Sequence, residues 1–164
     1  DVIFNLCISK IIIIIGSSMG GWISLIVAKR NPLTINGLIG IASAPDFVVG
    51  EWNRLSKEQK TQIKKDGKII INWDKYSEDY TITYNFLEDG KKNMILHEPI
   101  KIKCPIRLLH GRLDQVVSFE TSEKIINKIE SENKQLKIIE DGDHSLSRDQ
   151  DLKILFQTIT ELAL

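Results

Sequence analysis

The sequence has little cysteine and no surplus of charge of either sign. Among its 164 residues, the two cysteines, Cys7 and Cys104, stand far apart and lack the spacing of metal ligands. This favours a reducing, intracellular compartment over a disulfide-stabilised secreted protein. The 22 basic residues balance the 22 acidic ones, for a net charge of +0. Since no basic surplus is available for nucleic acid or anionic lipid, we expect no nucleic-acid partner.

Long hydrophobic runs are also missing. The longest, Ile11–Ile15, is far too short to span a bilayer, so no integral membrane segment is expected. The N-terminus does not show the basic, apolar and small-residue regions of a signal peptide. We therefore expect a cytoplasmic protein. Its 164 residues, 42% hydrophobic and 27% charged, are typical of a single globular domain.

The strongest pattern in the chain follows the five consecutive isoleucines. They run into the sequence GSSMG, after which apolar residues recur at helical spacing. Strand, sharp turn and helix, with G-x-S-x-G at the turn, is the pattern of the nucleophile elbow of α/β hydrolases. The turn strains the serine backbone, and Gly16 and Gly20 leave room for it to close. We expect the Ser18 hydroxyl at the tip. The Met19 N–H, in the unsatisfied first helical turn, is the expected oxyanion donor.

Short apolar runs alternate with helical patterns in the rest of the chain. The sequence Asn31-Pro32 ends the elbow helix. Together with the elbow strand, this alternation predicts a mostly parallel sheet with helices on both faces. Residues 1–10 have the pattern of a helix end. We therefore expect residues 1–164 to be the C-terminal part of an α/β-hydrolase fold. Strands are expected over 35–42, 106–109 and 136–139, and helices over 118–132 and 149–163.

Residues 47–96 have a different character. The segment 51–67 is polar and helix-prone, and the segment 68–73 is rich in β-branched residues. Aromatic side chains are frequent here, and they could simply pack on one another in a surface insertion. Because the stretch lies between two core strands, we favour a lid whose aromatic residues line an acyl or aromatic pocket. These residues are Trp52, Trp73, Tyr76, Tyr80, Tyr84 and Phe86.

A serine nucleophile needs a histidine base and an orienting carboxylate, which α/β hydrolases carry in the order serine, acid, histidine. Of the three histidines, His97 precedes every plausible acid loop and His110 precedes Asp114. Only His144 follows a strand-end acid and lies in a loop of its own. We predict Ser18 as nucleophile, His144 as base and Asp114 as the group that orients the imidazole. Each would leave the carboxyl end of a parallel strand, where open α/β sheets place their sites.

Other chemistries find less support in the sequence. A cluster of acidic residues near His144 could suggest a metal, but no second histidine stands at ligand spacing and H-E-x-x-H is absent. We interpret the cluster as a solvated acidic turn and expect no metal. Without a phosphate-cradling glycine loop or a dinucleotide fingerprint, no cofactor is expected either. A dehalogenase would need a carboxylate at the elbow, where Ser18 stands. The acidic residues are Glu140, Asp141 and Asp143.

Several segments together make the chain resemble one α/β-hydrolase family, that of the mitochondrial palmitoyl-protein thioesterases and acyl-glucuronide esterases. The resemblance covers nearly the whole chain, and it implies the same three catalytic residues, hydrolysis of S-acylated cysteine or of acyl esters, and a mitochondrial location. The segments are GSSMGGW, KYSE at Lys75–Glu78, the Tyr84–Phe86 stretch, LHEPI, CPIRLLHG at Cys104–Gly111 and TSEK at Thr121–Lys124.

The resemblance also implies that part of the fold precedes this sequence. In the family, early strands carry the loop that donates the second oxyanion N–H, so only Met19 would serve here. Three functions stay open. The first is a serine esterase or thioesterase acting on a small acyl ester or S-acylated thiol. The second is an inactive truncated or split-gene remnant that needs a complementing N-terminal segment. The third is a binding module that uses its lid without turnover.

Overall fold

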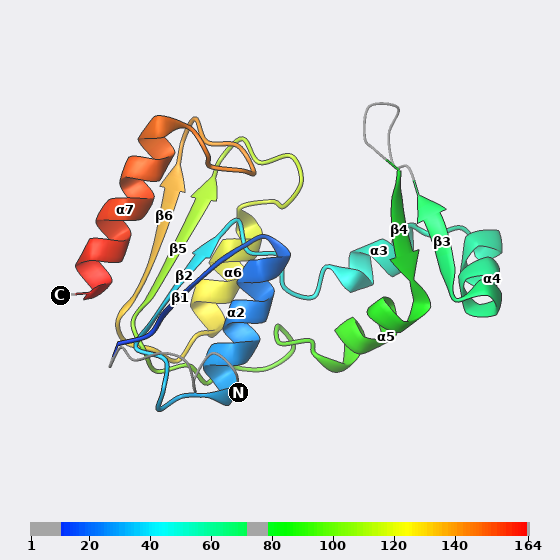
Figure 1. The fold of residues 1–164 in the computed structure, drawn as a ribbon, viewed down its shortest axis with the longest axis horizontal. Coiled ribbons are helices and arrows are strands. Elements are labelled where there is room, and N and C mark those ends of the chain that lie inside the picture. The colour runs from blue at the N-terminus through cyan, green and yellow to red at the C-terminus, as the bar shows by residue number, and fades with distance from the viewer. Residues whose placement is uncertain (1–10, 72–78, 164) are drawn as a thin grey trace. The chain divides into compact units, whose positions relative to one another are not determined.

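The computed structural model describes residues 11–71 and 79–163 (Figure 1). The helix end expected over residues 1–10 lies outside the described residues, as do Cys7, Trp73, Tyr76 and the Lys75–Glu78 segment. The chain divides into two compact units. One is Asp46–Met94, and the other consists of the segments before and after it.

The larger unit is built on a parallel sheet of four strands in the order β1-β2-β5-β6. These are β1, Ile13–Ser17; β2, Gly37–Ile41; β5, Ile106–Gly111; and β6, Lys134–Ile139. Every neighbouring pair in the sheet is parallel. Strand β2 lies between two others and all of its residues are buried, which explains its uninterrupted apolar sequence. The parallel sheet expected from the alternating pattern is confirmed.

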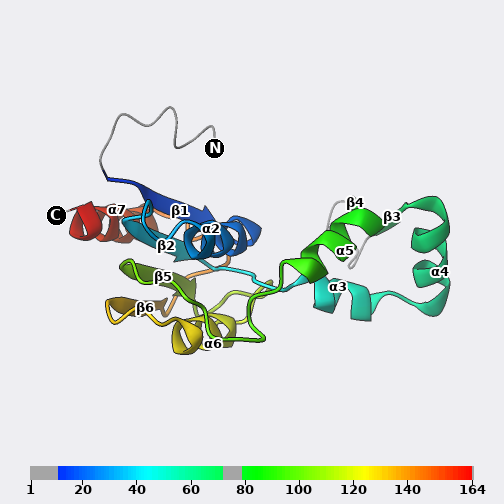
Figure 2. The same ribbon diagram turned by 90° about the horizontal axis from the view of Figure 1, so that it is seen from below.

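Helices cover both faces of this sheet. Figure 2 shows α2 and α6 against one face and α7 against the other. Their bounds are Met19–Arg30, Glu120–Lys128 and Asp149–Ala163. Apolar side chains of α7 pack on a buried cluster contributed by β2, β5 and β6, which includes Ile39, Leu109 and Ile139. The result is a three-layer α/β/α core with the loops after β1, β5 and β6 at one edge of the sheet.

One helix is shorter than the sequence suggests. A helix was expected over 118–132, but α6 ends at Lys128 because Ile129 adopts an extended conformation. Ile129 is buried and forms an isolated parallel bridge with Ile100. A tertiary contact therefore overrides the local helical pattern at this end.

The smaller unit, Asp46–Met94, combines three helices with a two-stranded sheet. The elements are α3, Val48–Arg54; α4, Lys57–Asp66; β3, Lys68–Ile71; β4, Tyr80–Thr83; and α5, Tyr84–Lys92. Strands β3 and β4 pair in antiparallel register. Buried aliphatic residues from every one of these elements, including Val48, Ile63 and Leu87, form the unit's core.

Capping residues divide the segment expected as one helix over 51–67. Ser56 is extended, its hydroxyl accepts from the Gln59 N–H, and the Gln59 side chain accepts from the Ser56 N–H. This reciprocal capping box starts α4 separately from α3. At the other end, Gly67 adopts the left-handed conformation with φ 76°, which ends α4 where the sequence indicated.

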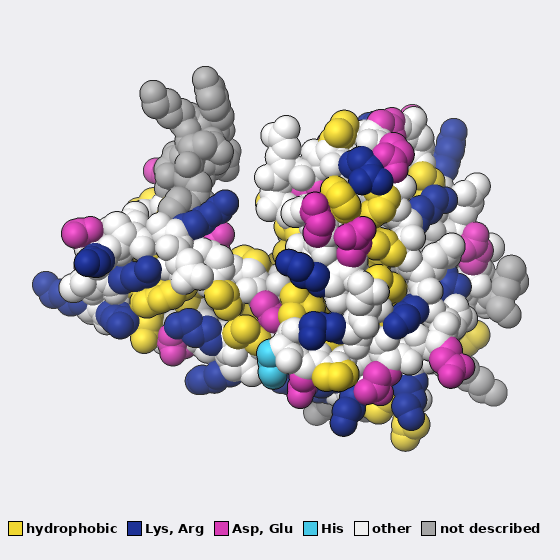
Figure 3. All heavy atoms as spheres, turned by 180° about the vertical axis from the view of Figure 1, so that it is seen from behind, with side chains coloured by type: hydrophobic (Ala, Val, Ile, Leu, Met, Phe, Trp, Pro, Cys, Tyr) yellow, Lys and Arg dark blue, Asp and Glu magenta, His cyan; other side chains and the backbone are white. Residues whose placement is uncertain are grey.

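Four aromatic residues of this unit pack in two pairs. The rings of Phe47 and Phe86 lie 5.9 Å apart between centroids, and those of Trp52 and Tyr84 lie 6.4 Å apart. Phe86 remains 37% exposed. On the face drawn in Figure 3, basic and acidic side chains lie interspersed, in keeping with the balanced composition. Within residues 11–71 and 79–163, no helix is both long and apolar enough to cross a bilayer.

Candidate active site

Ser18 occupies the sharp turn between β1 and α2. Its backbone has φ 52° and ψ −119°, a conformation that costs a residue with a side chain free energy and persists only where the surroundings impose it. The Ser18 N–H donates to the Ile41 carbonyl at 2.8 Å, and the Ser18 carbonyl accepts from the Ala44 N–H at 3.0 Å. The end of β2 therefore holds the elbow from both sides of the serine.

The two glycines of the elbow motif differ in their surroundings. A Cβ at Gly16 would lie 2.2 Å from the Gly20 carbonyl O, so only glycine lets the strand and the helix approach this closely. A Cβ at Gly20 would meet no described atom within 4 Å. The space-making role expected from the sequence therefore holds for Gly16, whereas nothing among the described residues requires it of Gly20.

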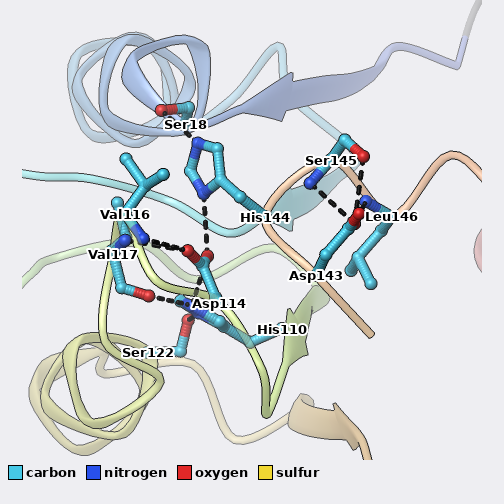
Figure 4. A network of polar contacts seen from close by, with 10 residues as sticks. All are labelled: Ser18, His110, Asp114, Val116, Val117, Ser122, Asp143, His144, Ser145 and Leu146. Atoms are coloured by element: carbon cyan, nitrogen blue, oxygen red, sulfur yellow. Dashed lines mark hydrogen bonds and ion pairs between the residues drawn. The ribbon is translucent and has the colours of Figure 1, made fainter. Parts of the chain in front are cut away.

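Ser18, His144 and Asp114 lie in one hydrogen-bonded row (Figure 4). His144 Nε2 lies 3.2 Å from Ser18 Oγ, and His144 Nδ1 lies 2.7 Å from Asp114 Oδ2. Because a carboxylate only accepts, Nδ1 carries the proton and Nε2 is left to accept from the serine hydroxyl. The His144 side chain is 27% exposed and that of Asp114 is 0% exposed. The row therefore runs from a buried acid side chain to a half-buried serine.

Backbone amides hold the carboxylate of Asp114 from the other side. Its Oδ1 accepts from the N–H groups of Val116 at 2.8 Å and Val117 at 2.9 Å. Burial acts to raise the pKa of Asp114, but the hydrogen bonds from Val117, His144 and Val116 outweigh it, and the pKa lies below its ordinary value. The group is therefore a carboxylate at neutral pH.

Close backbone contact joins the acid loop to the histidine loop. A Cβ at Gly111, the last residue of β5, would lie 2.3 Å from the Gly142 carbonyl O and 2.4 Å from that of Asp143. The Leu113 N–H also donates to the Gly142 carbonyl at 2.9 Å. These contacts fix the loop that carries Asp114 against the loop that carries His144.

The residues after His144 fold into a turn organised by Asp143. Its Oδ1 accepts from the N–H groups of Ser145 and Leu146, each at 3.0 Å. Leu146 has a φ of 44° and packs its side chain in the core cluster beneath α7. The histidine loop is thus anchored in the core immediately beyond the imidazole.

The acidic residues near His144 have protein partners. Glu140 pairs with the Arg112 guanidinium, and Asp141 accepts from Arg148 at 2.9 Å and from Gln150 at 2.7 Å. Asp143 accepts from the backbone of its own turn, as described above. Among the residues that the structure describes, no group of three histidine, cysteine or acidic side chains gathers at a metal-binding distance.

One residue beside the row was not singled out by sequence reasoning, which rejected His110 as the base. Its imidazole is fully buried, and Nε2 lies 3.1 Å from Asp114 Oδ2. The only sequence signal is its position four residues before the acid, at the end of an apolar strand. His97, by contrast, is exposed in a loop. Met19 is the first residue of α2, where a helical N–H has no intrahelical acceptor.

By its sheet order, flanking helices and elbow, the chain has the C-terminal part of an α/β-hydrolase fold. Solved structures support this. The mouse alpha/beta hydrolase domain-containing protein 10 superimposes with a TM-score of 0.84 at 31% identity, over 98% of this chain and 65% of that one. A putative hydrolase from Agrobacterium vitis S4 also gives 0.84, at 30% identity, over 93% and 61%.

In sequence, the chain resembles the mitochondrial palmitoyl-protein thioesterase. It is 35% identical to the human protein over 152 residues, which cover 92% of this chain and 49% of that protein. The bovine protein is 34% identical over the same share of each. The chain thus spans about half the length of the curated relatives it matches. A family profile described as "Serine aminopeptidase, S33" matches residues 74–151, which include Asp114 and His144 but not Ser18.

Proposed function

We propose that this chain hydrolyses acyl esters or thioesters through an acyl-enzyme on Ser18. The observation that carries the proposal is the hydrogen-bonded row from Asp114 through His144 to Ser18, at 2.7 and 3.2 Å. Serine hydrolases need this order of groups, because the acid fixes the tautomer of the imidazole that activates the serine. The printed name of the relatives, palmitoyl-protein thioesterase, supports an S-acylated thiol as the substrate class.

The proposed reaction has two balanced halves. Ser18 Oγ attacks the acyl carbonyl while His144 Nε2 takes its proton, and the same proton then leaves with the departing thiol or alcohol. In the second half, water attacks the acyl-serine and gives a proton to His144 Nε2. The bond from the acyl carbon to Ser18 Oγ then breaks, Nε2 returns the proton to Oγ, and the acid is released. Asp114 stabilises the imidazolium in both halves. The Met19 N–H is the proposed donor to the developing oxyanion, and one such donor is worth about 10²–10³ in rate.

A second proposal concerns residues 47–96, which we assign as a lid that holds the acyl group. Its support is the exposure of aromatic side chains: Phe86 is 37% and Tyr80 is 39% exposed. Large apolar side chains that stay accessible are available to a hydrophobic ligand. We also propose a mitochondrial location, which rests on the name of the relatives alone.

Covalent labelling tests the proposed chemistry. A fluorophosphonate probe should modify the folded chain at Ser18, and Ser18→Ala should abolish the label. Ser17→Ala, at the exposed end of β1, is the matched control and should label normally. Hydrolysis of a short-chain nitrophenyl ester and of an S-acyl thioester is then measured. A folded chain that stays unlabelled would overturn the proposal. Labelling without turnover would leave Ser18 as the activated serine but favour the sequence hypothesis of a remnant that needs a complementing segment.

A further inference from the structure

A second histidine, His110, lies against the carboxylate that orients His144 (Figure 4). The side chains of His110 and Asp114 are both 0% exposed. His110 Nε2 lies 3.1 Å from Asp114 Oδ2 and 2.8 Å from the carbonyl O of Val117, while Nδ1 lies 2.7 Å from Ser122 Oγ. One imidazole on β5 therefore contacts the acid, the turn after it and helix α6.

The neighbours of this imidazole select one tautomer. Both groups at Nε2, the Asp114 carboxylate and the Val117 carbonyl, can only accept, so Nε2 carries the proton. Nδ1 then accepts from the Ser122 hydroxyl, which is buried and has a proton to donate. A neutral imidazole with Nε2–H satisfies every contact, and the opposite tautomer would set a lone pair against two acceptors.

The turn after Asp114 is held from two directions. The Val117 N–H donates to Asp114 Oδ1, while the Val117 carbonyl accepts from His110 Nε2–H. His110 Nε2 also lies 3.1 Å from Asp114 Oδ2, so the positive end of its N–H dipole is close to the oxygen that accepts from His144. Movement of the Asp114 carboxylate would break its contacts with the Val117 N–H and with His110 Nε2.

We infer that His110 is a positioning residue for the proposed hydrolysis, which fixes the Asp114 carboxylate so that its Oδ2 stays aligned with His144. The inference rests on the proposed function, since it assigns His110 to the support of the same acid. The polar contacts of His110 run to Asp114, Val117 and Ser122, so we assign its effect on His144 to Asp114. Without it, the Val117 carbonyl loses a buried donor and the carboxylate loses a neighbour that restrains its rotation.

Two substitutions at His110 separate the effect of its Nε2–H donor from the effect of the volume of its side chain. His110→Leu removes the donor at similar size, and labelling of Ser18 by the fluorophosphonate should slow about 10- to 100-fold, as expected when a catalytic group is displaced. His110→Gln carries an N–H that can reach the position of Nε2 and should recover most of the rate. Leu108→Ala is the control, because Leu108 is equally buried on β5 and points to the same face of the sheet. Leu108→Ala should lower the stability of the chain, but the folded molecules should label at Ser18 at the wild-type rate.

Recovery in His110→Gln is the readout that a purely structural role would not move. The amide restores an N–H near the position of Nε2 but does not restore the shape of the ring.

Nitrogen NMR of the imidazoles gives a test that needs no reaction. The wild-type chain should show His110 as the Nε2–H tautomer and a strongly deshielded His144 Nδ1 proton, which His110→Leu should weaken. Finding the Nδ1–H tautomer of His110 would overturn the inference. So would a His110→Leu chain that labels at the wild-type rate, and that result leaves the proposed function standing. A wild-type chain that does not label refutes the proposed function, and the NMR result then decides the placement of His110 alone.

Discussion

The ionisation of Asp114 predicts how its replacement changes stability with pH. Its folded pKa is lowered, so the ionised carboxyl contributes stability that is present above the ordinary value of about 3.9 and is lost as pH falls below it. Asp114→Asn should therefore cost about 1–3 kcal/mol of unfolding free energy near pH 7, because a charged acceptor of several hydrogen bonds is lost. The difference should narrow below about pH 4. Urea unfolding of both proteins between pH 7 and pH 3 measures it.

An exposed carboxylate provides the control for this series. Asp66, at the end of α4, is exposed, and Asp66→Asn should change the unfolding free energy little at any pH. A gap between wild type and Asp114→Asn that stays constant down to pH 3 would contradict the ionised, hydrogen-bonded state of Asp114.

At the scale of single residues, the sequence indicates which side chains come together but not which contacts hold them in place. Ser18, Asp114 and His144 follow from motif and chain order, and the structure brings them together. The contact of His110 with the acid, and the two amides that donate to it, depend on the path of the turn after β5. No local pattern encodes a backbone N–H as a ligand, so these supports could be found only in three dimensions.

At the scale of elements, Gly111 is where the loop that carries Asp114 meets the loop that carries His144, and its replacement should separate the two loops. Gly111→Ala would place a Cβ 2.3 Å from the Gly142 carbonyl O, so the backbone must shift. We expect a loss of about 1–3 kcal/mol of stability, as for other overpacked sites. The displaced histidine loop should also lower the rate of Ser18 labelling about 100-fold. Thermal unfolding and labelling kinetics measure the two effects.

Gly50 in α3 supplies the matched substitution for that experiment. A Cβ there would meet no described atom within 4 Å, and the residue is exposed within a helix. Gly50→Ala should leave labelling unchanged and stabilise the chain by about 0.5–1 kcal/mol. If Gly111→Ala behaved like Gly50→Ala, the close approach of the loops would be refuted.

Elements with a consistent local signal could be predicted, and those shaped by distant contacts could not. The helix expected over 149–163 matches α7, which packs several apolar side chains on the buried core cluster while Phe156 stays exposed. Strand β4 and helix α5 were not anticipated, because the sequence from Tyr80 to Phe86 mixes β-branched, aromatic and polar residues without one period. Their boundary is set by Thr83, whose hydroxyl accepts from the Phe86 N–H and caps α5.

At the scale of the whole molecule, the division into two compact units predicts separable stability. Ile63 is 0% exposed in α4, so Ile63→Ala should destabilise the Asp46–Met94 unit by about 2–5 kcal/mol. Amides of β3 and β4 should then exchange faster with solvent, while those of β2 and β5 keep the wild-type rate, because each unit has its own core. Hydrogen exchange resolved by residue makes the comparison. Leu25→Ala, equally buried in α2, should give the opposite pattern. Faster exchange throughout the chain in both variants would mean that the two units unfold as one.

The lid proposal predicts which substrates the Ile63→Ala substitution would affect. A small fluorophosphonate needs only the activated serine, so Ile63→Ala should label at the wild-type rate. A long-chain S-acyl substrate would lose its apolar contacts with the lid, and its KM should rise while that of a short-chain ester stays the same. Phe86→Ala should reproduce the rise in KM without loss of fold, because Phe86 is 37% exposed. Replacing Leu33, which is 98% exposed in the other unit, by alanine is the control and should change neither KM. Equal effects on long- and short-chain substrates would contradict an acyl-binding lid and return the aromatic pairs to a purely structural role.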